Sequence, residues 1–142
     1  MATLNPYLNF NGNTEEVFNF YKSVFGGEFI GGISRFKDTP EGAKLSKADG
    51  EKVMHVALPI GKGNMLMGTD SVDGMGQKLV VGNNLSITVN PESEAETHKL
   101  FDGLAAGGTV LVPLNKAFWG GYFGMFADKF GVQWMINYTY KK

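Results

Sequence analysis

The chain has 142 residues, of which 43% are apolar and none is cysteine, and its formal net charge is −1. This length and apolar content are typical of one domain with its own core, and the lack of cysteine excludes disulfides and thiolate chemistry. A charge near zero gives no electrostatic basis for nucleic-acid binding, and no apolar run approaches the ~18 residues of a membrane span. We therefore expect one domain over residues 1–142, without nucleic-acid or membrane partners. We expect it to be cytoplasmic, because no basic stretch followed by an apolar one marks a signal peptide.

The first half of the chain is predicted to contain one helix and four strands. The helix begins near Asn13 or Thr14, either of which suits an N-cap, and Gly26-Gly27 ends it. Residues 37–52 are polar and interrupted by proline and glycine, which indicates a mobile excursion. The helix has apolar side chains at helical spacing, namely Val17, Phe20, Tyr21 and Val24. The strands cover residues 4–10, 28–36, 53–60 and 64–69.

The second half repeats this order after a glycine-containing linker over residues 71–82. Ser93-Glu94-Ala95-Glu96 has the pattern of a capping box, and Gly107-Gly108 ends the helix that follows. Residues 128–131 are typical of a hairpin turn in which Gly131 can adopt positive φ. The apolar stripe of this helix is Leu100, Phe101, Leu104 and Ala105. The strands cover residues 84–90, 109–114, 120–127 and 132–138.

Two matches between the halves indicate an internal duplication. The helix stripe of the first half maps onto that of the second at one constant offset, which pairs Val17 with Thr97 and Val24 with Leu104. The closing hairpins also match, since residues 63–67 (Gly-Asn-Met-Leu-Met) correspond to residues 131–135 (Gly-Val-Gln-Trp-Met). Because both matches occur in the same order, we infer two tandem βαβββ units, at about residues 3–70 and 83–139.

Four sequence motifs indicate which protein family the chain resembles. They are Asn5-Pro6-Tyr7-Leu8-Asn9-Phe10-Asn11-Gly12, Phe20-Tyr21-Lys22-Ser23-Val24-Phe25-Gly26-Gly27, Phe118-Trp119-Gly120 and Asp128-Lys129-Phe130-Gly131-Val132-Gln133-Trp134. Together with the repeated unit, they resemble the PhnB-like branch of the vicinal oxygen chelate superfamily, which includes glyoxalases, bleomycin-resistance proteins and extradiol dioxygenases. The resemblance implies an α+β fold in which the units form a curved mixed-sheet cup with helices packed outside, and it implies a homodimer.

The resemblance also raises the question of a metal. Enzymes of the superfamily hold a divalent metal in the cup through four side chains, whereas other members only sequester drugs. A methionine thioether suits Cu(I) rather than Zn, Ni, Mn or Fe(II), and a single asparagine is a weak donor, so we expect neither a metal nor a cofactor. The matching positions in this chain are Pro6 or Tyr7, Met67, Asn84 and Met135.

Some PhnB-like proteins carry a 3-demethylubiquinone methyltransferase label. A nucleotide-derived cofactor is typically bound by a parallel sheet with a glycine-rich loop between a strand and a helix. The sequence contains neither pattern. It therefore gives this label no support.

Strand alternation predicts which side chains face the cup. In the strand at 84–90, the apolar set that includes Leu85 should meet the helix. The first strand leaves two inward sets open, Pro6/Leu8 or Tyr7/Asn9. The inward sets elsewhere are Asn84, Ser86 and Thr88, then Gln133, Met135 and Asn137, and finally His55 and Ala57.

Seven residues are candidates for ligand contact, and each also has a simpler interpretation. His55 is the best candidate for acid–base chemistry, or it is only hydrogen-bonded within the sheet. Arg35 suits carboxylate or phosphate recognition, or it forms a surface salt bridge. Aromatic residues beside the Gly120-Gly121 pair line a pocket mouth, pack in the core or form a dimer contact, while methionines on facing strands form a soft apolar lining or only fill the core. The full set is His55, Met67, Asn84, Trp119, Tyr122, Met135 and Arg35.

These observations lead to one hypothesis and two alternatives. The hypothesis is a metal-free protein that binds a small apolar or aromatic molecule in its cup. The first alternative is a divergent metal-dependent lyase or dioxygenase-like enzyme that uses His55. The second alternative is a structural dimer without any ligand.

Overall fold

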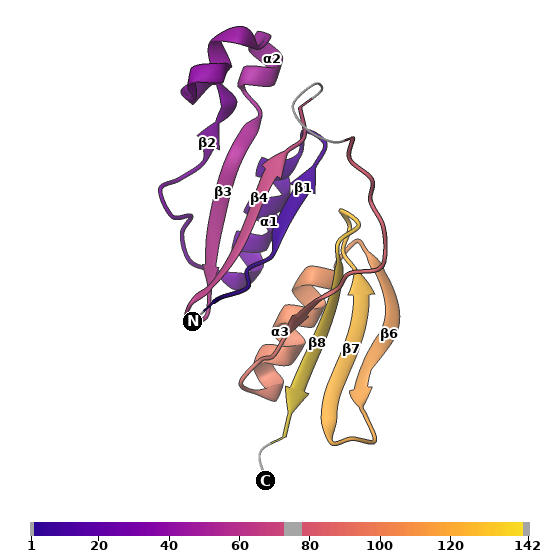
Figure 1. Ribbon diagram of the computed structural model, residues 1–142. Coiled ribbons are helices and arrows are strands. Elements are labelled where there is room, and N and C mark those ends of the chain that lie inside the picture. The colour runs from indigo at the N-terminus through magenta and orange to yellow at the C-terminus, as the bar shows by residue number, and fades with distance from the viewer. Residues whose placement is uncertain (1, 73–77, 141–142) are drawn as a thin grey trace. The chain divides into compact units, whose positions relative to one another are not determined.

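A computed structural model describes residues 2–72 and 78–140 (Figure 1). The chain divides into two compact units, Met1–Val80 and Val81–Lys142. Each unit has one four-stranded mixed sheet and one long helix, which confirms the predicted α+β class and the two βαβββ units. Of the predicted linker over residues 71–82, residues 73–77 lie outside the described residues.

The sheet of the first unit has the order β1-β4-β3-β2. Strands β1 and β4 run parallel, whereas β3 is antiparallel to both of its neighbours. Helix α1 (Thr14–Phe25) connects β1 to the rest of the unit and begins one residue after the predicted Asn13 cap. The strands are β1 (Tyr7–Phe10), β2 (Ser34–Arg35), β3 (Val53–Ile60) and β4 (Asn64–Asp70).

Helix α1 covers one face of this sheet. Val17, Phe18 and Tyr21 are fully buried on the helix. The Phe18 ring lies directly over Gly68, where an added Cβ would stand only 2.5 Å from Phe18 Cε1. Glycine at position 68 is therefore what lets the aromatic ring approach the strand backbone.

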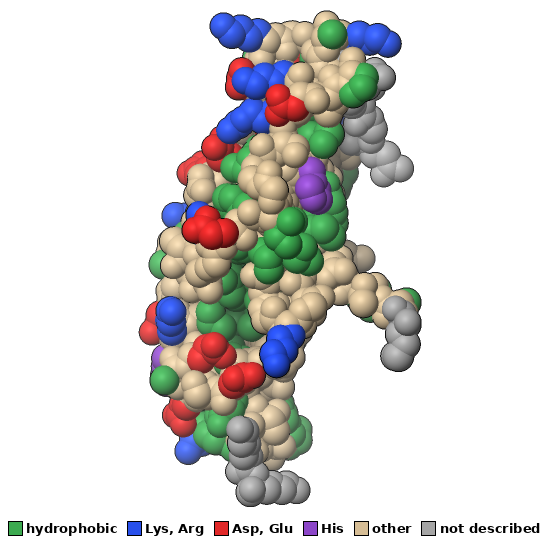
Figure 2. All heavy atoms as spheres, turned by 90° about the vertical axis from the view of Figure 1, so that its left-hand side faces the viewer, with side chains coloured by type: hydrophobic (Ala, Val, Ile, Leu, Met, Phe, Trp, Pro, Cys, Tyr) green, Lys and Arg blue, Asp and Glu red, His purple; other side chains and the backbone are tan. Residues whose placement is uncertain are grey.

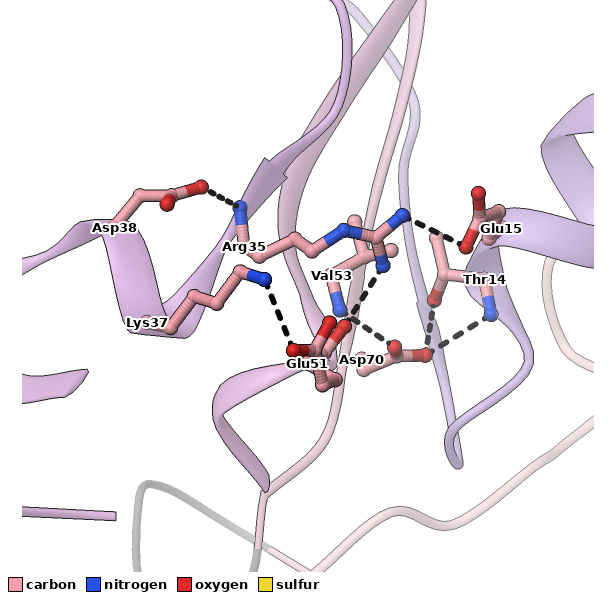
Figure 3. Close-up of polar contacts among 8 residues, drawn as sticks. All are labelled: Thr14, Glu15, Arg35, Lys37, Asp38, Glu51, Val53 and Asp70. Carbon is pink, nitrogen blue, oxygen red and sulfur yellow. Dashed lines mark hydrogen bonds and ion pairs between the residues drawn. The ribbon is translucent and has the colours of Figure 1, made fainter. Parts of the chain in front are cut away.

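A buried carboxylate joins α1 to the central strands (Figure 3). Asp70, only 3% exposed, accepts hydrogen bonds from the Thr14 backbone N–H at 3.0 Å and from the Thr14 hydroxyl at 2.6 Å. Its second oxygen accepts from the Val53 N–H at 2.8 Å. Neither predicted residue caps the helix with its own side chain, since Asn13 makes no capping bond. The first backbone N–H of the helix, that of Thr14, is instead satisfied by a residue 56 positions away.

The structure corrects two predictions for the segment between α1 and β3. The strand predicted over 28–36 is only the two residues of β2. The mobile excursion predicted over 37–52 is instead a run of short helices, in which Asp38 accepts from the Arg35 N–H and Ser46 caps its helix through the Asp49 N–H. Local side-chain bonds of this kind compete with strand pairing. The helices are η1 (Phe36–Asp38), η2 (Pro40–Lys44) and α2 (Lys47–Gly50).

The second unit repeats the topology of the first. Its sheet has the order β5-β8-β7-β6, with β5 parallel to β8 and the other pairs antiparallel. Phe101 of the helix lies over Gly124, where an added Cβ would clash with the ring. The elements are β5 (Ile87–Val89), α3 (Glu94–Ala105), β6 (Thr109–Lys116), β7 (Gly121–Ala127) and β8 (Gln133–Thr139).

In this unit the structure contains the predicted Ser93 cap and the predicted hairpin turn, but one strand is shorter than predicted. Ser93 caps α3 by accepting from the Glu96 N–H at 3.1 Å, but the Glu96 carboxylate accepts from Glu92 rather than from Ser93. Asp128 forms the predicted hairpin turn and accepts from the Trp134 indole at 2.9 Å. The strand predicted over 84–90 is only β5, and Leu85 is 75% exposed rather than packed against the helix.

Across the described ranges, no helix is both long enough and apolar enough to span a bilayer.

Replacing Asp70 by alanine should lower the free energy of unfolding by about 2–4 kcal/mol, because three buried donors lose a charged acceptor. Urea unfolding followed by far-UV circular dichroism measures this. The control is Glu28→Ala, which removes only the exposed ion pair with Lys22 and should cost less than about 0.5 kcal/mol. Equal stabilities of the two variants would contradict the role assigned to Asp70.

Candidate functional site

The first unit presents a sheet face turned away from α1. Met67 at the centre of β4 pairs with Tyr7 of β1 and with Ala57 of β3, and directly paired residues share a face. His55 lies two residues from Ala57 and shares that face. Figure 2 shows a histidine side chain at the surface of this unit with hydrophobic side chains beside it. We call this the first open face, and its residues are Tyr7, Asn9, His55, Ala57, Met65, Met67 and Thr69.

The pairing of β1 resolves the alternatives for the first strand. Tyr7 and Asn9 lie on the open face, whereas Phe10 is buried toward the helix. The parallel register with β4 decides this, because it places Tyr7 opposite Met67. Of the two inward sets, the structure therefore selects Tyr7/Asn9.

His55 has a phenol as its partner. The Tyr7 hydroxyl and His55 Nδ1 are 3.1 Å apart, and the two ring centroids are 5.8 Å apart. Burial raises the pKa of Tyr7 above its usual value, and the Thr69 side chain offsets part of this effect. A phenol that stays protonated remains a hydrogen-bond donor, so it favours the His55 tautomer whose Nδ1 accepts. The pair leaves Nε2 as the second polar position of the ring.

The second unit has an equivalent face turned away from α3. Met135 of β8 pairs with Met125 of β7 and with Thr88 of β5. Trp134 and Ile136, on either side of Met135, are fully buried toward the helix, which agrees with the predicted alternation. We call this the second open face, and its residues are Thr88, Phe123, Met125, Gln133, Met135 and Asn137.

Trp119 joins this face from the β6–β7 connection. Its ring packs edge-on against Phe123, with centroids 5.5 Å apart. A Cβ at Gly121 would stand 2.7 Å from Trp119 Nε1 and 2.6 Å from Asn137 Oδ1. Gly121 is therefore needed for the indole to fold back over the sheet on the same side as the Asn137 amide.

Three of the predicted candidates lie elsewhere. Tyr122 points to the helix side, where its hydroxyl is 3.1 Å from His98 Nε2. Arg35 forms an ion pair with Glu15 at 3.0 Å and donates to the Glu51 carbonyl at 2.8 Å, as Figure 3 shows, so its guanidinium ties β2 to α1. Asn84 is exposed in a bend before β5.

Within each unit, the predicted candidates that share an open face are His55 with Met67, and Trp119 with Met135. Three residues of the open faces were not among the predicted ligand contacts, namely Tyr7, Phe123 and Asn137. The alternation that selected Met135 also places Phe123 and Asn137 on its face, so that signal was available.

The donor chemistry of these faces does not fit a divalent metal. In the described residues, no three His, Cys, Asp or Glu side chains converge. The partners of His55 are the Tyr7 phenol and, across the ladder, Ser34 on β2, and neither side chain is a ligand that Zn, Ni, Mn or Fe(II) prefers.

Comparisons with known proteins place the chain among relatives. The family model described as 3-demethylubiquinone-9 3-methyltransferase matches residues 2–137. Protein YjdN of Escherichia coli K12 is 29% identical over an alignment that covers 94% of this chain and 93% of YjdN. Protein PA1353 of Pseudomonas aeruginosa is 37% identical, with a TM-score of 0.84 and 98% of both chains covered.

Two further solved structures extend the comparison. The Bacillus cereus PhnB protein, described as a putative 3-demethylubiquinone-9 3-methyltransferase, is 29% identical, with a TM-score of 0.74 over 97% of this chain and 100% of its own. A glyoxalase/bleomycin resistance protein/dioxygenase family enzyme of Burkholderia phytofirmans is 17% identical, with a TM-score of 0.62 over 94% and 97% of the chains. The second likeness concerns the fold alone, and it agrees with the fold that the sequence motifs predict.

Alkaline titration should reveal the Tyr7–His55 pair. Because burial raises the folded-state pKa of Tyr7, the stability that the neutral phenol contributes is fully present below the ordinary tyrosine pKa of about 10 and is lost as pH rises through the higher folded value. The Tyr7→Phe variant should lose one late-titrating phenol in absorbance at 295 nm and shift the His55 ring resonances in NMR spectra.

The matched control for this titration is Tyr140→Phe. Burial, and next the Glu94 carboxylate, also raise the pKa of Tyr140, but Tyr140 lies in the other unit. Its removal should shorten the same late phase and leave the His55 resonances unchanged. Unchanged His55 resonances in Tyr7→Phe would show that the pair does not form.

Proposed function

The chain belongs to the PhnB-like family, whose model is described as 3-demethylubiquinone-9 3-methyltransferase, and from that premise we propose that it binds a small apolar or aromatic molecule on the open faces of its sheets. The observation that carries the proposal is the composition of the two open faces. None of the residues that define them carries a formal charge other than a protonated His55. A sheet face in contact with water usually carries polar side chains. These two faces carry apolar ones as well, so they are suited to contact with a less polar molecule.

Methionine lies at the centre of each open face. Met67 on β4 and Met135 on β8 occupy equivalent strands of the repeat, and each is only partly exposed. Met65 and Met125 extend the same surfaces. Thioether side chains are flexible and polarisable, and they adapt to ligands of irregular or aromatic shape. The methionine surface therefore supports an apolar ligand rather than a charged one.

Each face also has a polar group beside the methionines. On the first it is the imidazole of His55, held by Tyr7 at 3.1 Å. On the second it is the Asn137 amide beside the Trp119 indole. A few oriented polar groups within an apolar lining are typical of small-molecule sites. This arrangement favours binding over the alternative of a purely structural protein.

The proposed binding function does not rest on the methyltransferase description of the family. A carboxylate rather than an open anion site meets the N-terminus of α1, where Asp70 accepts from the Thr14 N–H. The strand-to-helix loop at that point is therefore already satisfied by the protein itself. We also propose a homodimer, as expected from the family resemblance, and sedimentation equilibrium tests it by comparing the mass with the 15.4 kDa of the chain.

Binding is tested with 1-methoxynaphthalene, an aromatic probe without a hydrogen-bond donor. It should raise the melting temperature, since a ligand at 100 times its Kd stabilises by about 2.7 kcal/mol. A carboxylate in the centre of the occupied face should weaken fluorescence-detected binding by at least about tenfold, because apolar contact desolvates the charge. The variants are Met67→Glu for the first face and Met135→Glu for the second.

The controls keep the apolar volume at the same positions. Met67→Leu and Met135→Leu should bind within about threefold of the wild type, because volume-conserving swaps are tolerated. The Glu variant that loses binding identifies the sheet that holds the probe. No thermal shift with the wild type up to the solubility limit, or full binding by both Glu variants, would overturn the proposal.

Metal content gives an independent test. The protein purified without chelator should contain only substoichiometric Ni, Zn, Mn and Fe by elemental analysis, since the described residues bring no three preferred donors together. Addition of these ions should leave the melting temperature unchanged. A tightly bound stoichiometric metal would favour the alternative of a metal-dependent lyase or dioxygenase-like enzyme.

A further inference from the structure

The imidazole of His55 has one nitrogen occupied and one available on the first open face. Its Nδ1 lies 3.1 Å from the Tyr7 hydroxyl, and within the described residues Nε2 forms no hydrogen bond. A phenol is protonated at neutral pH and donates to Nδ1, so the proton of the neutral ring lies on Nε2. In an imidazolium Nε2 carries a proton as well. His55 therefore presents a hydrogen-bond donor to a molecule that contacts this face.

A hydroxyl group borders this donor. Ser34 of β2 pairs directly with His55 across the ladder, and directly paired residues share a face with their Cβ atoms about 4.5–5.5 Å apart. Both side chains are partly exposed, and over residues 2–72 and 78–140 the Ser34 hydroxyl has no hydrogen-bond partner. A carbonyl oxygen has two lone pairs, so one ligand oxygen at this edge of the face can accept from both side chains.

The apolar part of the face begins next to the donor. Ala57 follows His55 on the same face of β3 and pairs with Met67 of β4. Two residues along a strand span about 6.6 Å. An aromatic ring that lies on Met67 and Ala57 therefore brings a substituent at its edge to the imidazole of His55.

The charges around the donor favour a neutral ligand over an anion. Arg35 follows Ser34 in the chain, but its guanidinium is paired with the Glu15 carboxylate at 3.0 Å. A carboxylate ligand would lose its hydration on this face without an unpaired arginine in exchange, and such desolvation is costly. A neutral acceptor loses far less.

We propose that the first open face binds an aromatic ketone or aldehyde. Its carbonyl oxygen accepts from His55 Nε2 and from the Ser34 hydroxyl, and its ring lies on Met67. The Tyr7 hydroxyl acts as a positioning group, because it keeps the acceptor of the imidazole turned away from the ligand. This inference rests on the proposed binding function and adds to it the chemical class of the ligand and the face that binds it.

The experiment compares 2-acetylnaphthalene with 2-isopropenylnaphthalene, in which a methylene group replaces the carbonyl oxygen at nearly the same shape. Isothermal titration calorimetry on the full chain should show that the wild type binds the ketone about tenfold more tightly, the ratio that one ordinary hydrogen bond supplies. His55→Phe removes the donor and should bring this ratio near one, with binding of the alkene retained. His98→Phe is the matched control, because His98 also has a tyrosine partner but lies in the other unit. It should keep the tenfold ratio.

A second measurement needs no variant and covers the case in which His55→Phe does not fold. The chain has two histidines, so isotope labelling of the histidine ring nitrogens gives one set of NMR signals for each. At neutral pH, Nε2 of His55 should have the chemical shift of a protonated nitrogen. The ketone should move this signal, whereas the alkene should not, and the His98 signals should stay in place with both probes.

Three results would overturn the inference and leave the proposed function standing. They are an unprotonated Nε2 of His55 in the free protein, equal affinities of the two probes for the wild type, and a tenfold ratio that persists in a folded His55→Phe protein. Binding of neither probe would overturn both the inference and the proposed function.

Discussion

Each unit depends on one packing constraint, the close approach of an aromatic side chain on the helix to a glycine in the sheet. Phe18 over Gly68 and Phe101 over Gly124 leave no room for a Cβ on either strand. Close packing at these points commits one sheet face to the helix. Because strand side chains alternate, the opposite set of side chains is then committed to the other face. The position of every candidate ligand contact on the strands follows from this.

The constraint also explains which parts of the site could be predicted from the sequence. Long strands such as β3 and β8 show enough alternation to assign their faces. The structure agrees with this assignment for β8, where Trp134 lies on the helix side and Met135 on the opposite face. The partner of His55 could not be found in this way. Tyr7 lies 48 residues away and reaches His55 only because β1 runs parallel to β4 beside β3. A four-residue strand has no periodicity that reveals such a register.

The wrong predictions have other physical causes. Residues 28–36 and 84–90 are apolar enough to resemble strands, yet only two and three residues pair. Local polar bonds decide the structure of residues 37–52, where Asp38 and Ser46 close short helical turns. Arg35 was a candidate for anion recognition, but its guanidinium has a carboxylate and a carbonyl of the protein as partners. The pattern of residues within a short segment does not show which distant residues its side chains will contact.

The duplicated scaffold carries different polar groups in its two copies. The first open face has a phenol–imidazole pair, in which donor and acceptor satisfy each other. The second has an amide oxygen without a partner beside an indole. In both copies methionine stands on the central strand, so the apolar part of the surface is common to the repeat while the hydrogen-bonding part is not.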